Sequence, residues 1–268
     1  MNRIKALLIA FIAVILIACS TVPITGRHQL NLLPQETMLS MSLQEYDQFL
    51  KKNPLSKNQA QAQMVQRVGL RIQGAVEQYF AQNNISEELS NYAWEFNLVE
   101  SNDINAWCMP GGKVVVYTGI LPLTQDETGL AVVMGHEIAH AVAQHGNERM
   151  SQGLIAQLGG VALSTALETE PEATQSLWMA AYGLGAQFGL MLPYSRLHEN
   201  EADHLGLIFM SMAGYDPNAA VAFWQRMAAK KEDSSPPAFL STHPSDKNRI
   251  KNIQLLIPEA MQYYKKPS

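Results

Sequence analysis

The chain has 268 residues, with 19 basic and 24 acidic side chains and a formal net charge of −5 at neutral pH. This acidic balance, without any basic stripe, excludes nucleic acid as an expected partner. The length is enough for one large domain with a proper hydrophobic core.

The first 18 residues have the features of a secretory signal peptide. Arg3 and Lys5 precede an apolar run, residues 6–18, which is shorter than the roughly 20 residues that span a bilayer. The run ends in LIAC, which resembles the lipobox of bacterial lipoproteins, where Cys19 becomes the lipidated N-terminus; the alternative is an uncleaved N-terminal anchor. Because Ser20 rather than Asp follows, the sorting rule of enteric bacteria implies attachment to the outer membrane. We therefore expect a lipid-anchored protein on the periplasmic face of a bacterial cell envelope.

Three segments are expected. Residues 1–18 form the signal peptide, residues 19–36 a polar tether after the lipidated Cys19, and residues 37–268 a single domain. Cys108 is then the one internal cysteine, so no intrachain disulfide is available.

Hydrophobic periodicity predicts helices first, then a few strands, then helices again. Helical spacing covers residues 36–51 and 58–82, and strand-like patterns cover residues 91–101 and 113–119. Further helices are expected at about residues 124–146, 172–191 and 195–213, from Asp216, and from near Ser245.

Two of the later segments carry specific expectations. The helix over residues 124–146 opens with Thr124 and Glu127 at capping-box spacing and closes on Gly146. Residues 151–167 are apolar and rich in small side chains, which favours buried or lid-like packing over a membrane-facing helix.

The stretch HEIAH, residues 136–140, has the pattern of a zinc-hydrolase site. On a helix, His136 and His140 lie about 40° apart on one face, so both imidazoles can bind one ion. Glu137 lies about 100° round the helix, where it can reach a water molecule without binding the metal. Two histidines do not complete such a site, and a third protein ligand must come from elsewhere.

Helical phase selects that ligand. His145 points away from the pair, so it is expected to be a surface or structural residue. In SRLHENEADHLG, residues 195–206, Glu199 and Asp203 share a stripe with small residues that allow close approach to the first helix. Glu199 is therefore the expected ligand, and Asp203 the acceptor for the other N–H of a ligand histidine. Glu201 and His204 lie off the stripe and are expected to be solvated.

HEIAH followed by SRLHENEAD resembles the HtpX and CAAX-prenyl-protease group of gluzincin metallopeptidases, peptidase family M48. The stretches VPITGRHQLNLLP, NDINAWCMPGGKVVVYTGIL and STHPSDKNRI extend this resemblance, and within the group the chain most resembles the bacterial lipoprotein branch represented by LoiP and BepA.

The resemblance implies an α+β, mostly helical, zincin-like metallopeptidase domain with a small β-sheet before the HExxH helix. It implies one Zn²⁺ per chain, held by His136, His140 and Glu199, with Glu137 as base and Asp203 as supporting acid. It also places His243 near the metal, either donating to the oxyanion or blocking the open coordination position. BepA-type members carry a C-terminal helical-repeat domain that these motifs do not include, so partner docking through such repeats is not expected.

The expected function is zinc-dependent hydrolysis of misfolded or unassembled cell-envelope proteins. The alternative is a non-proteolytic assembly factor or chaperone that uses the same fold with a latent metal site. The segment NAWCMPGGKVVVYTG is the expected edge strand for substrate binding, in which Trp107 and Cys108 either line the cleft or pack the sheet. The sequence gives neither the oligomeric state nor the cleavage preference.

Overall fold

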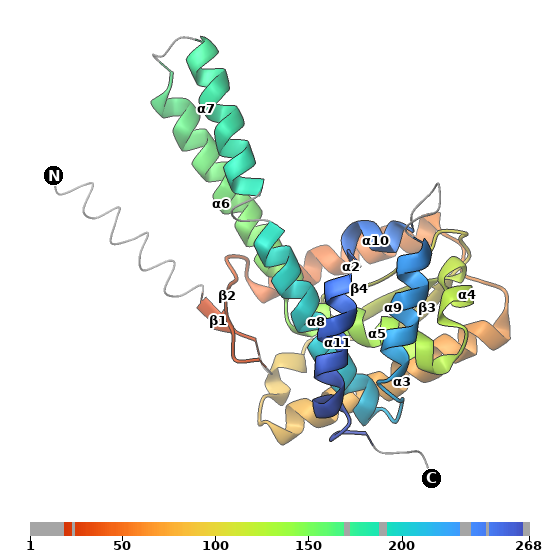
Figure 1. Ribbon diagram of the computed structural model, residues 1–268. Coiled ribbons are helices and arrows are strands. Elements are labelled where there is room, and N and C mark those ends of the chain that lie inside the picture. The colour runs from red at the N-terminus through yellow and green to blue at the C-terminus, as the bar shows by residue number, and fades with distance from the viewer. Residues whose placement is uncertain are drawn as a thin grey trace. The chain divides into compact units, whose positions relative to one another are not determined.

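The computed structural model (Figure 1) describes the chain in six stretches, which are residues 19–22, 25–168, 172–187, 192–230, 237–244 and 247–264. The expected signal peptide and the side chain of Cys19 lie outside them, so lipidation stays a prediction. The chain divides into two compact units, one of residues 1–38 and 144–198, the other of residues 39–143 and 199–268.

Helices form most of the described structure. The α-helices are α2 (Gln35–Lys52), α3 (Gln59–Gln82), α4 (Leu121–Thr124), α5 (Glu127–Val142), α6 (His145–Ala166), α7 (Glu172–Gly185), α8 (Leu192–Met212), α9 (Ala219–Lys230), α10 (Ala238–Thr242) and α11 (Lys247–Ala260). The strands are β1 (Cys19–Thr21), β2 (His28–Leu30), β3 (Glu95–Val99), β4 (Ala106–Met109) and β5 (Lys113–Tyr117), and the 3₁₀ turns are η1 (Ser86–Leu89) and η2 (Thr118–Ile120). A small sheet thus precedes α5, and the expected mostly helical α+β fold is confirmed.

The sheet of the second unit has the strand order β3-β5-β4. Strand β3 runs parallel to β5, and β4 runs antiparallel to it. Strand β4 is therefore an edge strand of this sheet, and it packs against α5. The segment NAWCMPGGKVVVYTG thus supplies an edge strand through β4, as expected, whereas its second half forms the central strand β5.

The two faces of this sheet bury different helices. Phe96, Val114 and Cys108 are neighbours in register and share one face, and the ring of Phe96 packs against Gly69 of α3. The side chain of the next residue in each strand lies on the opposite face of the sheet. On that face Asn97 donates a 2.7 Å hydrogen bond to the hydroxyl of Tyr46 in α2. Helices α3 and α5, which pack together, thus lie on the face opposite α2.

Helix α5 begins and ends at other residues than the sequence predicts. Its N-cap is Asp126, whose carboxylate accepts a 2.8 Å hydrogen bond from the N–H of Gly129, so the capping box from Thr124 is wrong. The helix ends at Val142, because Gln144 adopts the left-handed conformation with φ 57° and starts a new helix. Gly146 consequently lies inside α6.

Helices α5 and α8 cross in backbone contact at two glycines. A Cβ on Gly206 would lie 2.9 Å from the amide nitrogen of His136 and 3.0 Å from the carbonyl carbon of Gly135. The predicted role of a small residue at position 206 is therefore confirmed. This close approach brings the acidic stripe of α8 to the histidines of α5.

The other unit combines the N-terminal segment with the helices α6 and α7. Strands β1 and β2 pair antiparallel, and β2 packs against α6. Helices α6 and α7 pack together as a hairpin (Figure 1), with Leu158 67%, Val161 59% and Trp178 55% exposed. Leu158 and Val161 lie within residues 151–167, so the buried packing expected there is wrong for these two positions, and the lid-like alternative stays a prediction. None of the helices in the described part of the chain combines the length and apolarity needed to cross a bilayer.

Candidate metal centre

Four buried side chains from three parts of the second unit converge on one point. His136 and His140 come from α5, Glu199 from α8, and His243 from the residue that follows α10. One ligand atom from each lies within 4.8 Å of the others. The sequence prediction of His136, His140 and Glu199 as neighbours agrees with this geometry, and His243 joins them.

The separations between these atoms fit a single zinc ion. Ligands of a tetrahedral zinc, each about 2.0–2.2 Å from the metal, lie about 3.3 Å or slightly more from one another. Nε2 of His136 lies 3.1 Å from Nε2 of His140 and 3.4 Å from Glu199, and His140 lies 3.3 Å from Glu199. Nδ1 of His243 lies 3.1 Å from Nε2 of His136 and 3.0 Å from Oε1 of Glu199. His243 thus stands at the fourth corner.

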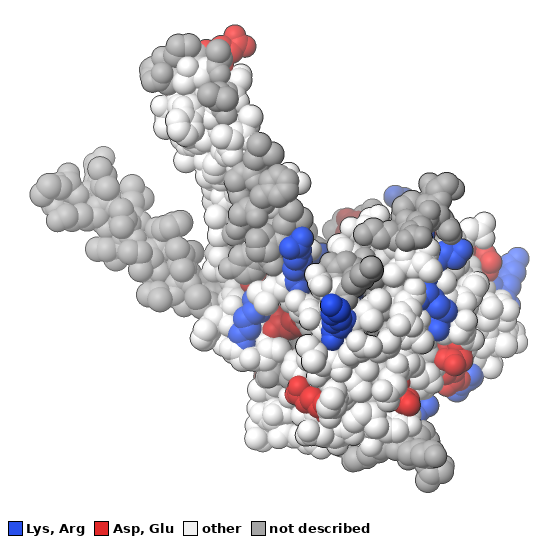
Figure 2. Space-filling model, viewed as in Figure 1, with Lys and Arg blue, Asp and Glu red and all other residues white. Residues whose placement is uncertain are grey.

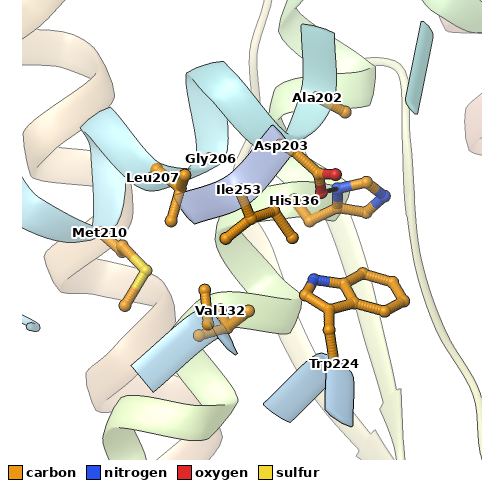
Figure 3. A pocket seen from close by; sticks show the side chains of 10 residues that line it. Val132, His136, Ala202, Asp203, Gly206, Leu207, Met210, Trp224 and Ile253 are labelled. Carbon is orange, nitrogen blue, oxygen red and sulfur yellow. Dashed lines mark ion pairs between the residues drawn. The ribbon is translucent and has the colours of Figure 1, made fainter. Parts of the chain in front are cut away.

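Asp203 fixes the ring of His136. Its Oδ1 lies 3.0 Å from Nδ1 of His136, as Figure 3 shows, so the Nδ1–H donates to the carboxylate and Nε2 is the nitrogen left to bind a metal. Burial lowers the pKa of His136, but the hydrogen bonds to Asp203 and Glu199 outweigh it and raise the pKa to about 9. A metal ion must therefore displace a proton from His136 at neutral pH.

Arg249 of α11 holds the two acids of α8 together. Its guanidinium donates to both oxygens of Asp203, at 2.8 and 2.7 Å, and lies 3.0 Å from Glu199. The guanidinium carbon also lies 3.4 Å from the ring centroid of Trp224, a cation–π contact. Burial alone would raise the pKa of both acids. The charge of Arg249 outweighs burial and lowers the pKa of Asp203, and hydrogen bonds from the surrounding histidines lower the pKa of Glu199.

The charges of the site suit a divalent cation. Glu137, Glu199 and Asp203 are buried carboxylates, and Arg249 is their one buried guanidinium among the described residues. When all three acids are ionised, two negative charges remain uncompensated, which one Zn²⁺ balances. The donor set and the charge therefore both fit zinc.

Glu137 occupies the position of a base rather than a ligand. It is buried, and its Oε1 lies 3.3 Å from Nε2 of His243 but has no hydrogen-bond partner among the described residues. Burial raises the pKa of Glu137, and a higher pKa makes the carboxylate a stronger proton acceptor.

Three residues near the motifs lie outside the metal-binding group. His145 is fully buried and its ring stacks on that of His198, with centroids 4.3 Å apart, so the structural role is confirmed and the surface role is wrong. Glu201 is buried, so the expectation that it is solvated is wrong, because α8 is enclosed on several faces. His204 is partly exposed and lies 3.0 Å from Glu259.

The alternation of β4 separates Trp107 from Cys108. Trp107 packs edge-on against Tyr46 and Phe49 of α2, so it packs the sheet and does not line the metal centre. Cys108 lies on the opposite face, where burial and the charge of Glu137 raise the pKa of its thiol well above the ordinary value. The thiol therefore stays protonated at neutral pH, as expected for a residue that is not a nucleophile.

Arg249 and Trp224 were not identified from the sequence as residues of the metal centre. Arg249 lies within the stretch STHPSDKNRI, which the resemblance marks but does not explain. The signal that could have found it is charge: two expected buried acids on one stripe of α8 require a buried cation.

The peptidase family M48 model matches residues 66–257, which include all of these site residues. The chain belongs to peptidase family M48. It is 40% identical over 173 residues to the mitochondrial metalloendopeptidase OMA1 of Schizosaccharomyces pombe, covering 64% of this chain and 49% of that protein. It is 34% identical over 250 residues to the mitochondrial metalloendopeptidase OMA1 of Bos taurus, covering 90% and 46%.

A bacterial relative matches as well. The β-barrel assembly-enhancing protease of Yersinia pestis is 31% identical over 169 residues, covering 60% of this chain and 34% of that protein. The chain thus spans about half the length of the mitochondrial relatives and about a third of this bacterial one. The family expected from the motifs is confirmed, and relatives in both mitochondria and bacteria share it.

Proposed function

We propose that this chain is a zinc endopeptidase of the bacterial cell envelope that hydrolyses misfolded or unassembled proteins. The observation that carries the proposal is the convergence of His136, His140 and Glu199 with the buried carboxylate of Glu137 beside them. A protein that only binds its partners has no need of the base, so the presence of Glu137 favours hydrolysis over an assembly factor or chaperone.

The chain's own residues divide the work of peptide hydrolysis. Zinc held by these residues would polarise the scissile carbonyl and lower the pKa of a water molecule, so that a hydroxide nucleophile is available at neutral pH. Glu137 accepts the proton of the attacking water and delivers it to the leaving amine. Asp203 holds His136 in the ligating tautomer, and Arg249 holds Asp203 and Glu199 in place.

Substrate binding is assigned to β4. This strand is at the edge of its sheet and packs against α5, so an extended peptide that pairs with it would run beside the helix that carries Glu137. Main-chain hydrogen bonds give such binding little dependence on side-chain sequence, which suits an enzyme for unfolded proteins.

His243 holds the enzyme in a latent state. Its Nδ1 is the fourth donor of the metal group, and its Nε2 lies 3.3 Å from Glu137. A catalytic zinc needs one position open for water and substrate. His243 must therefore leave this place before hydrolysis begins.

The envelope location is proposed from the N-terminal sequence. The lipobox ending at Cys19 supports lipid anchoring, most simply to the outer membrane, and the bacterial relatives of this chain are named for β-barrel assembly. Cys19→Ala should abolish incorporation of radiolabelled fatty acid into the protein. A wild-type protein that incorporates no fatty acid would contradict the lipid anchor and favour the uncleaved one. Incorporation that persists in Cys19→Ala would contradict Cys19 as the lipidated residue.

Digestion of an unfolded protein tests the activity. The chain should release fragments from reduced, unfolded casein, and a chelator or Glu137→Gln should abolish the release, while Glu137→Gln still binds zinc stoichiometrically. Cleavage that survives both treatments would refute a metallopeptidase. A zinc-loaded wild-type and His243→Ala that both leave the substrate intact would favour the assembly factor.

A further inference from the structure

The α6–α7 hairpin exposes an apolar surface that the metal centre does not use. Leu154, Leu158 and Val161 follow one another at helical spacing along α6, and their exposed fractions are 38%, 67% and 59%. On α7, Trp178 is 55% exposed and Met179 36%. Large apolar side chains that stay partly in water forgo part of the free energy that burial would supply, and several of them together mark a binding site.

The charges along the hairpin select the partner. From residue 150 to residue 195 the sequence holds no lysine or arginine, and its acids are confined to the turn between the helices, at residues 168–172. In Figure 2 the described part of the hairpin surface is accordingly white, with red only near its tip. The next cations along the chain are Arg149 and Arg196, both exposed, at the end of the hairpin away from the turn. Apolar side chains flanked by arginine match the boundary between acyl chains and phosphates in a bilayer.

The hairpin belongs to the same compact unit as residues 25–38, the segment that follows the proposed N-terminal membrane anchor. Strand β2 packs on α6, the N–H of Leu32 donates to Ser151 at 2.8 Å, and the side-chain amide of Asn147 donates to the carbonyl of Leu33 at 2.8 Å. Arg27 and Glu148 add an ion pair with N–O distances of 2.8 and 3.0 Å. Whether the anchor is a lipid on Cys19 or the apolar run itself, it is tied to the first turns of α6.

We propose that the α6–α7 hairpin lies on the membrane surface as a second, apolar contact beside the N-terminal anchor. Leu154, Leu158 and Val161 enter the acyl boundary, and the acidic turn stays in the headgroup layer, so the hairpin lies in the interface and does not span the bilayer. Binding is mainly hydrophobic and needs no anionic lipid, because the hairpin carries no lysine or arginine beyond Arg149 in the first turns of α6. This inference extends the proposed envelope location and rests on it.

Fluorescence quenching tests the contact in the anchored full-length protein. The protein is reconstituted in phosphatidylcholine vesicles whose acyl chains carry bromine, which quenches tryptophans that reach them. We expect quenching that Trp178→Phe removes, that Trp107→Phe leaves unchanged, and that 0.5 M salt does not reduce. Replacing both Leu158 and Val161 with glutamate should lower the quenching at least severalfold; helical circular dichroism shows whether that variant is folded.

Casein digestion in the same samples separates the two proposals. Digestion without Trp178-dependent quenching overturns the membrane contact alone, and quenching without digestion overturns the peptidase alone. If the glutamate variant digests casein more slowly than wild type in solution and wild type shows no quenching, the hairpin binds unfolded clients instead. A third outcome is that no quenching is seen and that, without vesicles, sedimentation shows a dimer for the wild type but a monomer for the glutamate variant. The partner is then a second copy of the chain. Both results overturn the proposal.

Discussion

Replacing Arg249 with methionine should destabilise the protein far more than removing an exposed arginine. Arg249 is 5% exposed in its side chain, and its partners Asp203 and Glu199 are 4% and 9% exposed. Its removal leaves two buried carboxylates without their cation, for which breaking a buried pair costs about 3–5 kcal/mol. For a chain of this size each kcal/mol lowers the unfolding midpoint by about 2–4 °C, so we expect a loss of about 6–20 °C in the presence of chelator.

Arg67→Met is the matched control. Arg67 forms a 2.7 Å ion pair with Glu127, but the two side chains are 56% and 34% exposed, and exposed pairs contribute about 0–1 kcal/mol. The assay is thermal unfolding followed by circular dichroism, with chelator and with zinc. Zinc should restore part of the loss in Arg249→Met, because the metal neutralises Glu199. Equal midpoints for the two variants would refute the reasoning that Arg249 balances the acids of the metal centre.

Three further predictions concern the helices that carry the ligands. Gly206→Ala places a Cβ against the backbone of α5, so it should cost about 1–3 kcal/mol in unfolding free energy and weaken zinc binding. The control is Gly74→Ala, whose Cβ would have nothing within 4 Å and which should stabilise α3 by up to about 1 kcal/mol. Chemical denaturation measures both, and equal effects would contradict the close crossing. Glu199→Ala should lose zinc by elemental analysis while Glu201→Ala, also buried, keeps it; the reverse result would contradict the helical phase. Because the pKa of His136 is raised to about 9 and zinc displaces its proton, zinc affinity measured by calorimetry should rise about tenfold per pH unit from pH 6.5 to 8.5, and a flat profile would show that no proton is displaced.

Local periodicity was sufficient to find three of the four side chains that converge at the candidate metal centre. The spacing of His136 and His140, and the shared stripe of Glu199 and Asp203, follow from 3.6 residues per turn once the two helices are known. The small residue Gly206 indicated a close crossing, because only a missing Cβ lets two helix backbones touch. These are properties of one element or one pair of elements, and the sequence encodes them directly.

The remaining features depend on tertiary packing. The burial of Glu201 depends on how many sides of α8 are enclosed, and the ion pairs of Arg249 depend on where α11 returns to the site, so no local pattern predicts either. The start of α5 was misplaced because Thr124 and Asp126 are both good caps, and only the backbone conformation shows that Asp126 is used. The place of His243 within the group of possible ligand atoms also required the position of its Nδ1 in the folded chain.

The latent state held by His243 is the central claim, and the rate of casein digestion by His243→Ala relative to wild type tests it most directly. Both proteins are loaded with zinc, and metal content is measured in each. The account predicts faster digestion by His243→Ala, abolished by chelator, because the fourth position of the metal and the space beside Glu137 become open. A fully zinc-loaded His243→Ala that digests casein more slowly than wild type would contradict the claim, because His243 would then assist the reaction.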